Sequence, residues 1–265
     1  MTLFGLGAVV GLVLALTGAG GSIIGVPLLM FGMGWTLTQA SPVALVAVAV
    51  SATVGTLLGL RDKVVRYRAA VLMAAGGIAA MPAGLYAAHR LPLLPLTLAF
   101  AALLMAAAIR AFLLTVRVQS ETRDPDAACL IDPDTGRFHW TPRCGRVLST
   151  AGIAAGLLSG LFGVGGGFLI VPALRRVTAL PMGSIIATST MVIAIVCTVT
   201  ALTAAIAGHL PGMRALPFAG GAIVGMVVGR QFAVRVAGPR LQQGFAVLTA
   251  VAAIAVAVRA IVGAS

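Results

Sequence analysis

The chain has 265 residues, of which 60% are apolar and 9% are charged, and its mean hydropathy is +1.10. A water-soluble protein needs more polar residues than this to cover its surface. The composition therefore excludes a soluble domain and indicates an integral membrane protein surrounded by a lipid bilayer. The formal net charge is +12. The basic residues lie in short clusters between apolar runs, which is typical of topology signals and argues against nucleic acid as a partner.

The chain begins with two short apolar stretches. About 15 apolar residues at 3–17 precede the glycine cluster Gly18-Ala-Gly-Gly-Ser22 and a second short stretch that contains Pro27. Each arm is too short to cross a ~30 Å hydrocarbon core comfortably, so we expect a re-entrant hairpin of two half-helices. Pro27 lacks a backbone N–H and should end or kink the second arm. No Lys or Arg precedes Arg61, so we expect no cleaved signal here.

Three long apolar runs follow, and each is long enough for a full helical crossing. They are followed by a hydrophilic stretch, 117–146, that holds five of the six acidic residues. Its Asp-Pro pairs and the turn-forming segment Asp134-Thr-Gly136 predict a loop, which we interpret as a cytoplasmic linker. The three runs lie at 40–59, 67–88 and 92–116.

The second half repeats the first. Between residues 7–27 and 152–172 there are nine identities in 21 positions at a constant offset of 145, and an internal repeat in an apolar chain is typical of secondary transporters. A short arm at 147–162, the cluster Gly163-Val-Gly-Gly-Gly167 and Pro172 come first. Three more long runs then follow, at 184–207, 213–236 and 241–263.

A hairpin and three crossings are an odd number of passes, so the second half should be inverted relative to the first. This arrangement divides the basic residues 15:3 between the two sides, whereas single crossings in place of hairpins would give 12:6. The positive-inside rule therefore favours an all-α polytopic protein of two inverted repeats, with both termini outside the cytoplasm. The expected units are a first transmembrane repeat at 1–116, a linker at 117–146 and a second transmembrane repeat at 147–265.

The glycine clusters are the predicted binding site. Glycines expose backbone N–H groups, and the helix that follows each cluster directs its positive dipole end to the same point, which suits a small anion. The inverted halves would bring the two tips together near the membrane centre. Glycines such as Gly7 and Gly152 are better explained by close helix packing. The predicted backbone donors are Gly20, Gly21 and Ser22 in the first tip and Gly165, Gly166 and Gly167 in the second.

Hydroxyl groups lie near the start of the next helix in each half. Ser41 has this place in the first half, and Thr188, Ser189 and Thr190 have it in the second. Serine and threonine are helix N-cap residues, so capping explains one hydroxyl at each place, and the surplus in the second half indicates ligand contact. No Asp or Glu lies within a predicted span, which argues against cation transport. No cofactor is expected.

Five other residues are not assigned to the binding site. Cys129 and Cys144, with His139, lack the close spacing of a zinc site, and we expect no disulfide framework from three cysteines. Cys197 lies in mid-span and should be a small apolar filler. Arg230 should extend toward the membrane interface, as long basic side chains do.

The run Gly160-Leu-Phe-Gly-Val-Gly-Gly-Gly-Phe-Leu-Ile-Val-Pro172, followed by Ala187-Thr-Ser189, resembles the TauE/SafE family of sulfite and organosulfur exporters. Gly18-Ala-Gly-Gly-Ser-Ile-Ile-Gly-Val-Pro27 is its first-half partner. The resemblance covers nearly the whole chain apart from the linker and implies a membrane carrier for sulfite, thiosulfate, sulfoacetate or another small anion. The first half departs from the family pattern at Ser22 and at Ala40-Ser-Pro42.

The sequence therefore predicts an inner-membrane exporter of a small sulfur-containing anion that works by alternating access, and a homo-oligomer is compatible with this interpretation. A passive anion channel of the same fold and a non-transporting assembly or partner protein remain as alternatives. An intramembrane enzyme would need Ser22 as nucleophile with His89 or His209 as base. Both histidines lie at predicted helix ends, far from a mid-membrane serine, so we predict no enzyme.

Overall fold

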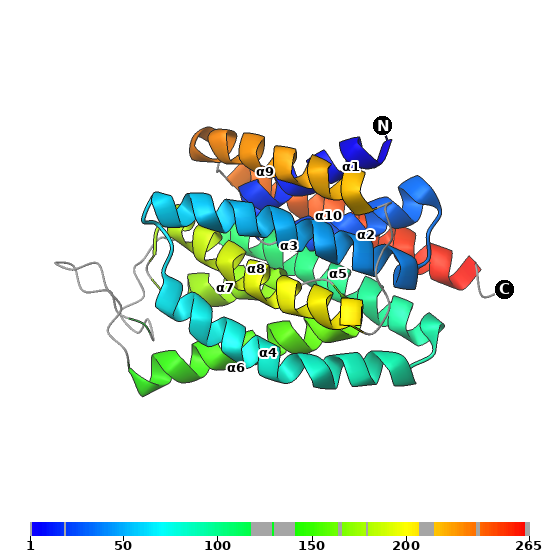
Figure 1. Ribbon diagram of the computed structural model, residues 1–265, viewed down its shortest axis with the longest axis horizontal. Helices are drawn as coiled ribbons and strands as arrows, with labels where there is room; N and C mark the ends of the chain where they lie inside the picture. Colours follow the sequence, from blue (N-terminus) through cyan, green and yellow to red (C-terminus); the bar gives the residue numbers. More distant parts are fainter. Residues whose placement is uncertain are drawn as a thin grey trace.

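The computed structural model describes residues 2–18, 20–117, 129, 141–163, 166–178, 180–206, 215–236 and 239–262. These residues form ten α-helices in one bundle (Figure 1), and within them the only β-type pairing is a single bridge between Cys129 and Thr178. Helices are expected here, because in lipid each backbone N–H and C=O must be bonded within its own segment.

Five helices come from each half, and they follow the predicted apolar runs closely. The first half forms α1 (Thr2–Thr17), α2 (Gly20–Met33), α3 (Leu37–Arg61), α4 (Tyr67–Arg90) and α5 (Leu93–Arg117). The second half forms α6 (Pro142–Phe162), α7 (Gly167–Val177), α8 (Met182–Ile206), α9 (Ala215–Val236) and α10 (Pro239–Val262).

Six helices of the described chain are long and apolar enough to cross a membrane: α3, α4, α5, α6, α8 and α9. Helices α1, α2 and α7 are shorter, with 16, 14 and 11 residues. The prediction for α6 was wrong in length, because this helix has 21 residues rather than a short arm at 147–162. Thr141 caps its N-terminus by accepting a hydrogen bond from Cys144 N, so the helix takes in the last residues of the predicted linker.

The glycine ridge of α6 packs against α4 of the other half (Figure 1). A Cβ on Gly152 would overlap the carbonyl oxygen of Met73, and one on Gly156 would overlap that of Gly77. The two backbones touch directly, as is common where small residues bring helices together in lipid.

The same contact joins α1 to α9. A Cβ on Gly7 would overlap the carbonyl oxygen of Phe218, and one on Gly11 would overlap that of Ala222. Each of these residue numbers differs by 145 from its counterpart in the α6–α4 contact. The internal repeat is therefore present in the packing between the halves as well as in the sequence. The first helix of each half packs against the other half.

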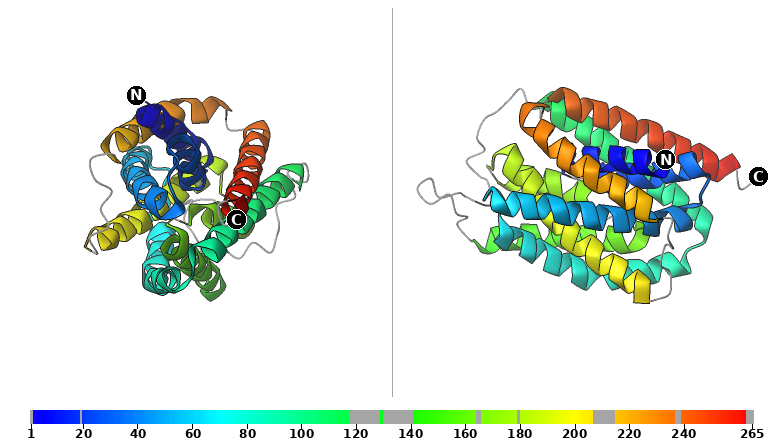
Figure 2. Two further views of the ribbon diagram at one scale, coloured as in Figure 1. Left: turned by 90° about the vertical axis from the view of Figure 1, so that its right-hand side faces the viewer. Right: turned by 45° about the horizontal axis from the view of Figure 1, so that its top comes forward.

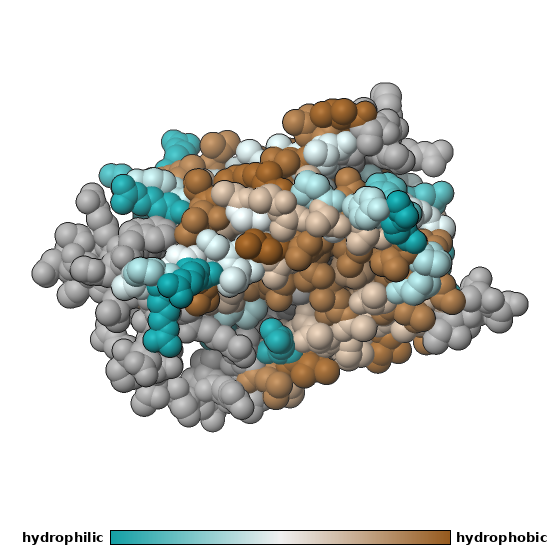
Figure 3. All heavy atoms as spheres, turned by 90° about the horizontal axis from the view of Figure 1, so that it is seen from below, coloured by the Kyte–Doolittle hydropathy of each residue, from teal (hydrophilic) through white to brown (hydrophobic). Residues whose placement is uncertain are grey.

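Helices α3 and α8 pack together in the middle of the bundle, and α5 and α10 lie side by side on one flank (Figure 2). Many side chains in the centre of the bundle are small, and residues such as Ala44, Ala47 and Val48 are fully buried. Figure 3 shows apolar side chains along the middle of one face, with most hydrophilic ones toward its ends. That distribution suits a bundle whose middle lies in hydrocarbon.

The breaks between short helices fall at glycines and not at prolines. Pro27 lies inside α2 and Pro172 inside α7, so neither proline ends its arm, and the alternative that they kink these helices stays a prediction. The chain turns instead at Gly18 and Gly163, both with a φ of 68°. Side chains other than glycine rarely adopt this left-handed conformation, so the glycine clusters set the turns.

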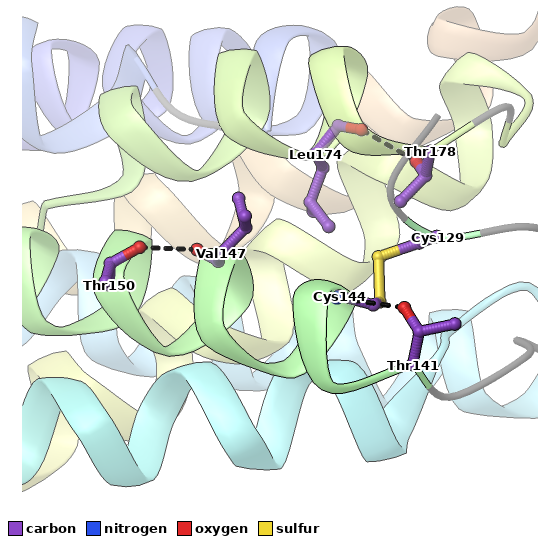
Figure 4. The surroundings of a disulfide bond; sticks show 7 residues. All are labelled: Cys129, Thr141, Cys144, Val147, Thr150, Leu174 and Thr178. Atoms are coloured by element: carbon purple, nitrogen blue, oxygen red, sulfur yellow. Dashed lines mark hydrogen bonds between the residues drawn. A yellow bond between two sulfur atoms is a disulfide. The ribbon is translucent and has the colours of Figure 1, made fainter. Parts of the chain in front are cut away.

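A disulfide joins Cys129 to Cys144, contrary to the expectation that the cysteines form no such link (Figure 4). The backbone of Cys129 pairs with Thr178 at the end of α7, while Cys144 lies in the first turn of α6. This arrangement brings the two Cα atoms within 5.0 Å, and both cysteines are buried. The contact depends on a long-range fold of the chain, which the spacing of cysteines does not reveal.

Candidate functional site

Two turns carry the glycine clusters. We name residues 18–22 the first tip and residues 163–167 the second tip. Helix α2 begins in the first tip and α7 in the second, and these two helices touch each other. The first N–H groups of a helix have no partner within it, so each tip presents backbone donors and a partial positive charge. Gly165 and the side chain of Ser22 lie outside the described residues.

Gly21 and Gly166 hold their tips against the preceding helix. A Cβ on Gly21 would lie 2.7 Å from the Cβ of Leu14, and one on Gly166 would overlap the carbonyl oxygen of Ala155. Gly166 also has a φ of 60°. Both glycines are therefore needed for packing, whatever they contribute to binding, and a bulky substitution at either position would disturb the fold.

Ser189 reaches the first tip from the other half of the chain. Its hydroxyl donates to the carbonyl oxygen of Gly18 or to that of Ile186, both at 2.9 Å. Gly18 follows the last residue of α1, where helix carbonyls lack partners. Ser189 is fully buried and satisfies one of them.

Ser41 has the corresponding place at the second tip. Its hydroxyl donates to the carbonyl oxygen of Phe162, the last residue of α6, at 3.1 Å. A Cβ on Gly163 would lie 3.0 Å from the Cβ of Ser41. Each tip is thus capped by a serine from the other half.

The predicted hydroxyls are not N-caps, which corrects their expected position. Helix α3 begins earlier, after Thr36, where the Oε1 atom of Gln39 accepts a hydrogen bond from Thr36 N at 3.3 Å. Ser41 therefore lies inside α3. Thr188, Ser189 and Thr190 likewise lie inside α8, which begins at Met182.

The remaining two predicted hydroxyls differ from each other. The Oγ1 atom of Thr188 accepts a hydrogen bond from the backbone N–H of Arg66 at 3.0 Å. Thr190 donates to the carbonyl oxygen of Ile186, one turn back in its own helix, at 2.7 Å. Thr53, Thr56, Thr200 and Thr203 also bond to carbonyls of their own helices.

Arg230 connects the two halves, which its predicted interfacial position did not anticipate. Its Nη1 atom donates to the carbonyl oxygen of Gly55 at 2.9 Å, and its Nη2 atom donates to Oδ2 of Asp62 at 2.7 Å. Asp62 is the only acidic residue outside 118–140. That isolation is the one signal in the sequence that marks Asp62 for a specific partner.

Arg259 makes a similar connection to α2. It donates to the carbonyl oxygens of Met30 and Gly34, and its guanidinium lies 5.8 Å from the ring centre of Phe31. These carbonyls belong to the C-terminal end of α2, where a positive charge is favourable. An arginine of the second half therefore fixes the C-terminal end of α2.

Most side chains at the candidate site are hydrogen-bond donors. Around the tips and the α3–α4 turn the described side chains include hydroxyls, arginines and Lys63, with Asp62 as the one carboxylate. Within the described residues, no group of three His, Cys, Asp or Glu side chains is placed to hold a metal ion. Such a set suits the recognition of an anion.

Known proteins resemble the chain along most of its length. A family model described as "Sulfite exporter TauE/SafE" matches residues 3–256. Two proteins named "Probable membrane transporter protein", from Xylella fastidiosa strains Temecula1 and 9a5c, are each 30% identical over 232 residues, which cover 87% of this chain and 84% of the relative. No solved structure matches significantly. From its coverage by the family model, the chain belongs to the TauE/SafE family of sulfite exporters, and it is a multi-pass membrane transporter of that family.

Proposed function

We propose that the protein exports a small sulfur-containing anion, such as sulfite, thiosulfate or an organosulfonate, across the bacterial inner membrane. The description of its family supports this substrate class, and its relatives are named as membrane transporters. The set of donors around the two tips is consistent with a negatively charged substrate.

The observation that carries the proposal is the contact between α2 and α7, the two helices that begin in the glycine tips. A helix N-terminus carries roughly half a unit charge, worth only ~0.3–1 kcal/mol when exposed but more where water is excluded. We propose that the two ends meet near one point, where they replace part of an anion's hydration. The proposed donors are the N–H groups of Gly20, Gly21, Ser22, Gly165, Gly166 and Gly167 and the hydroxyls of Ser41, Thr188, Ser189 and Thr190.

The hydrogen bonds of Ser41 and Ser189 can couple anion binding to a movement between the two halves. In the structure, Ser189 donates to Gly18 O and Ser41 donates to Phe162 O. A hydroxyl has one proton to donate, so an anion that takes it over leaves a carbonyl of the other half unpaired. Binding therefore loosens the contact between a tip and the opposite half, and this loosening is the proposed start of alternating access.

We further propose that the halves are inverted repeats and that each helix pair α1–α2 and α6–α7 is a re-entrant hairpin. The directions of the helices support this: both termini lie at one end of the bundle, opposite to the end of α5 and the start of α6 (Figure 1). With the positive-inside distribution, that end faces away from the cytoplasm.

Transport by purified protein in liposomes tests the proposal. Uptake of sulfite, thiosulfate, sulfoacetate and chloride is measured for the wild type, for the double variant Ser41→Ala/Ser189→Ala and for Ser51→Ala. Ser51 is a matched control, because it is as buried as Ser189 but donates to the carbonyl of Ala47 or Val48 in its own helix. We expect saturable uptake and counter-transport of a sulfur anion, reduced about tenfold or more in the double variant and unchanged in Ser51→Ala.

Three outcomes would contradict the proposal in different ways. Flux without saturation or counter-transport would make the protein a channel. No flux of any anion would favour a partner or assembly role. Equal flux in the wild type and the double variant would remove the serines from the site.

A further inference from the structure

We propose that Thr188, one of the proposed donors, also forms an oxyanion subsite with Arg66 beside the α3–α4 turn (residues 62–66), where the substrate first meets or last leaves the protein. The identity of the anion rests on the proposed function above. The subsite itself rests on the donors described below, and it can be tested without transport.

Arg66 carries a buried donor without an acceptor. Its Nε atom is buried and has no hydrogen-bond partner among the described residues. Nearly all buried polar groups in folded proteins are paired, and an unpaired group attached to a charge is especially costly. A guanidinium that keeps such an N–H free is suited to receive an anionic oxygen from outside the chain.

Thr188 contacts the backbone of the same residue. Its Oγ1 atom accepts the hydrogen bond from Arg66 N at 3.0 Å, and the residue is fully buried. This bond uses a lone pair and leaves the hydroxyl proton free to donate. The described structure gives that proton no acceptor, so Thr188 and Arg66 together offer an O–H and an N–H donor.

Arg230 completes the surroundings on the side of α9. A Cβ on Gly59 would lie 3.5 Å from both the Nη1 atom of Arg230 and the Cβ of Ala187, the residue before Thr188. The backbone of Arg66 and the guanidinium of Arg230 thus flank the same short segment of α8. The unpaired charge of Arg66 and the Thr188 hydroxyl favour a small oxyanion over a neutral ligand, while Arg230 is already paired with Asp62.

The charges near the turn are not balanced by carboxylates. Arg61, Lys63 and Arg68 lie on or beside it and are exposed, and the single nearby carboxylate, Asp62, is paired with Arg230. Arg66 therefore has no carboxylate partner in the described part of the chain. An excess of positive charge at a bundle end also attracts anions from solution.

The first experiment measures binding by the full-length protein in detergent. Thermal stability is recorded as sulfate or sulfite replaces chloride at constant ionic strength. We expect both oxyanions to stabilise the wild type, with an apparent Kd about tenfold higher or more in Arg66→Gln, because a charge-assisted donor is lost. Arg68→Gln is the matched control, since it removes an exposed charge two residues away, and its Kd should change less than twofold.

Conservative variants separate binding from folding. Arg66→Lys keeps the charge but lacks the Nε–H, so it should restore the stability of the ligand-free protein without restoring the Kd. Thr188→Ser keeps the hydroxyl and should bind as the wild type does, whereas Thr188→Val should bind weakly. In liposomes, Arg66→Lys should raise KM for the transported anion more than it lowers the maximal rate.

The inference is overturned if the wild type shows no stabilisation by oxyanions, or if Arg66→Gln and Arg68→Gln shift the Kd equally. It is also overturned if Arg66→Lys binds as tightly as the wild type. A wild type that binds sulfate at Arg66 but moves no anion in liposomes would contradict the proposed function and leave this subsite standing.

Discussion

Ser189 and Gly18 are 171 positions apart in sequence, yet the Ser189 hydroxyl donates to the Gly18 carbonyl oxygen at 2.9 Å. Ser41 makes the reciprocal contact with Phe162. Helices α1 and α6 are therefore each followed or ended by a carbonyl that accepts from a hydroxyl of the other half. The two halves cannot move apart without leaving a helix carbonyl unpaired, which in lipid has no water to replace the lost donor.

Removing the hydroxyl of Ser189 should lower stability. In Ser189→Ala the Gly18 carbonyl is left without this donor, and we expect a loss of about 1 kcal/mol, which is typical of a hydrogen bond between helices in a membrane. Reversible unfolding in mixed detergent measures it. Ser51→Ala should lose less, because Ser51 bonds only within its own helix. Equal losses would show that the contact between halves adds nothing.

Adding a methyl group to the glycine ridge should have opposite effects at two positions of α6. Gly156→Ala drives a Cβ into the Gly77 carbonyl and should cost about 1–3 kcal/mol or more. Gly145→Ala has open space and should gain about 0.5–1 kcal/mol, because alanine favours a helix. Melting temperatures in detergent distinguish the two variants. A similar rise for both would contradict direct backbone contact between α4 and α6.

Counting free thiols tests the disulfide. Cys129 and Cys144 are bonded and Cys197 is a buried free thiol. A maleimide should therefore label none of them in the native protein, one after denaturation and three after denaturation with reduction. Mass spectrometry gives the count. Three labels without reductant would rule out the bond, and the variant Cys129→Ser/Cys144→Ser shows which sites are labelled.

Replacing Arg230 should cost more than replacing Asp62. The carboxylate side of this ion pair is 61% exposed, and exposed pairs contribute about 0–1 kcal/mol, so Asp62→Asn should have a small effect. Arg230→Gln also loses the bond to Gly55 O and the packing of its stem. We expect the free energy of unfolding to fall by about 1–2 kcal/mol more. Equal losses of unfolding free energy in Asp62→Asn and Arg230→Gln would show that Arg230 stabilises the protein only through its ion pair with Asp62.

The sequence predicts the helices well because lipid leaves few choices. Apolar runs of the right length must be helical, so the predicted span at 67–88 agrees closely with α4 (Tyr67–Arg90). The offset of 145 also leads to the correct equivalence between Gly7 and Gly152, because both glycines serve the same contact in the two halves.

The long-range partners were beyond the sequence. The pairing of Arg230 with Gly55, of Cys129 with Cys144 and of Ser189 with Gly18 depends on which helices are neighbours. Periodicity describes one helix at a time and cannot supply this. For the site, residue types predicted hydroxyls near the glycine turns, but the bonds that these hydroxyls make with the opposite half follow only from the assembled bundle.

The exchange of first helices between the halves has a consequence for how such a protein can be made. A polypeptide ending after α5 would leave the small-residue face of α1 without its partner α9. A polypeptide starting at α6 would likewise leave the small-residue face of α6 without its partner α4. Two separately synthesised fragments should therefore be stable only when produced in the same cell. By the same reasoning, a one-unit ancestor before gene duplication would have needed a second copy of itself to fold.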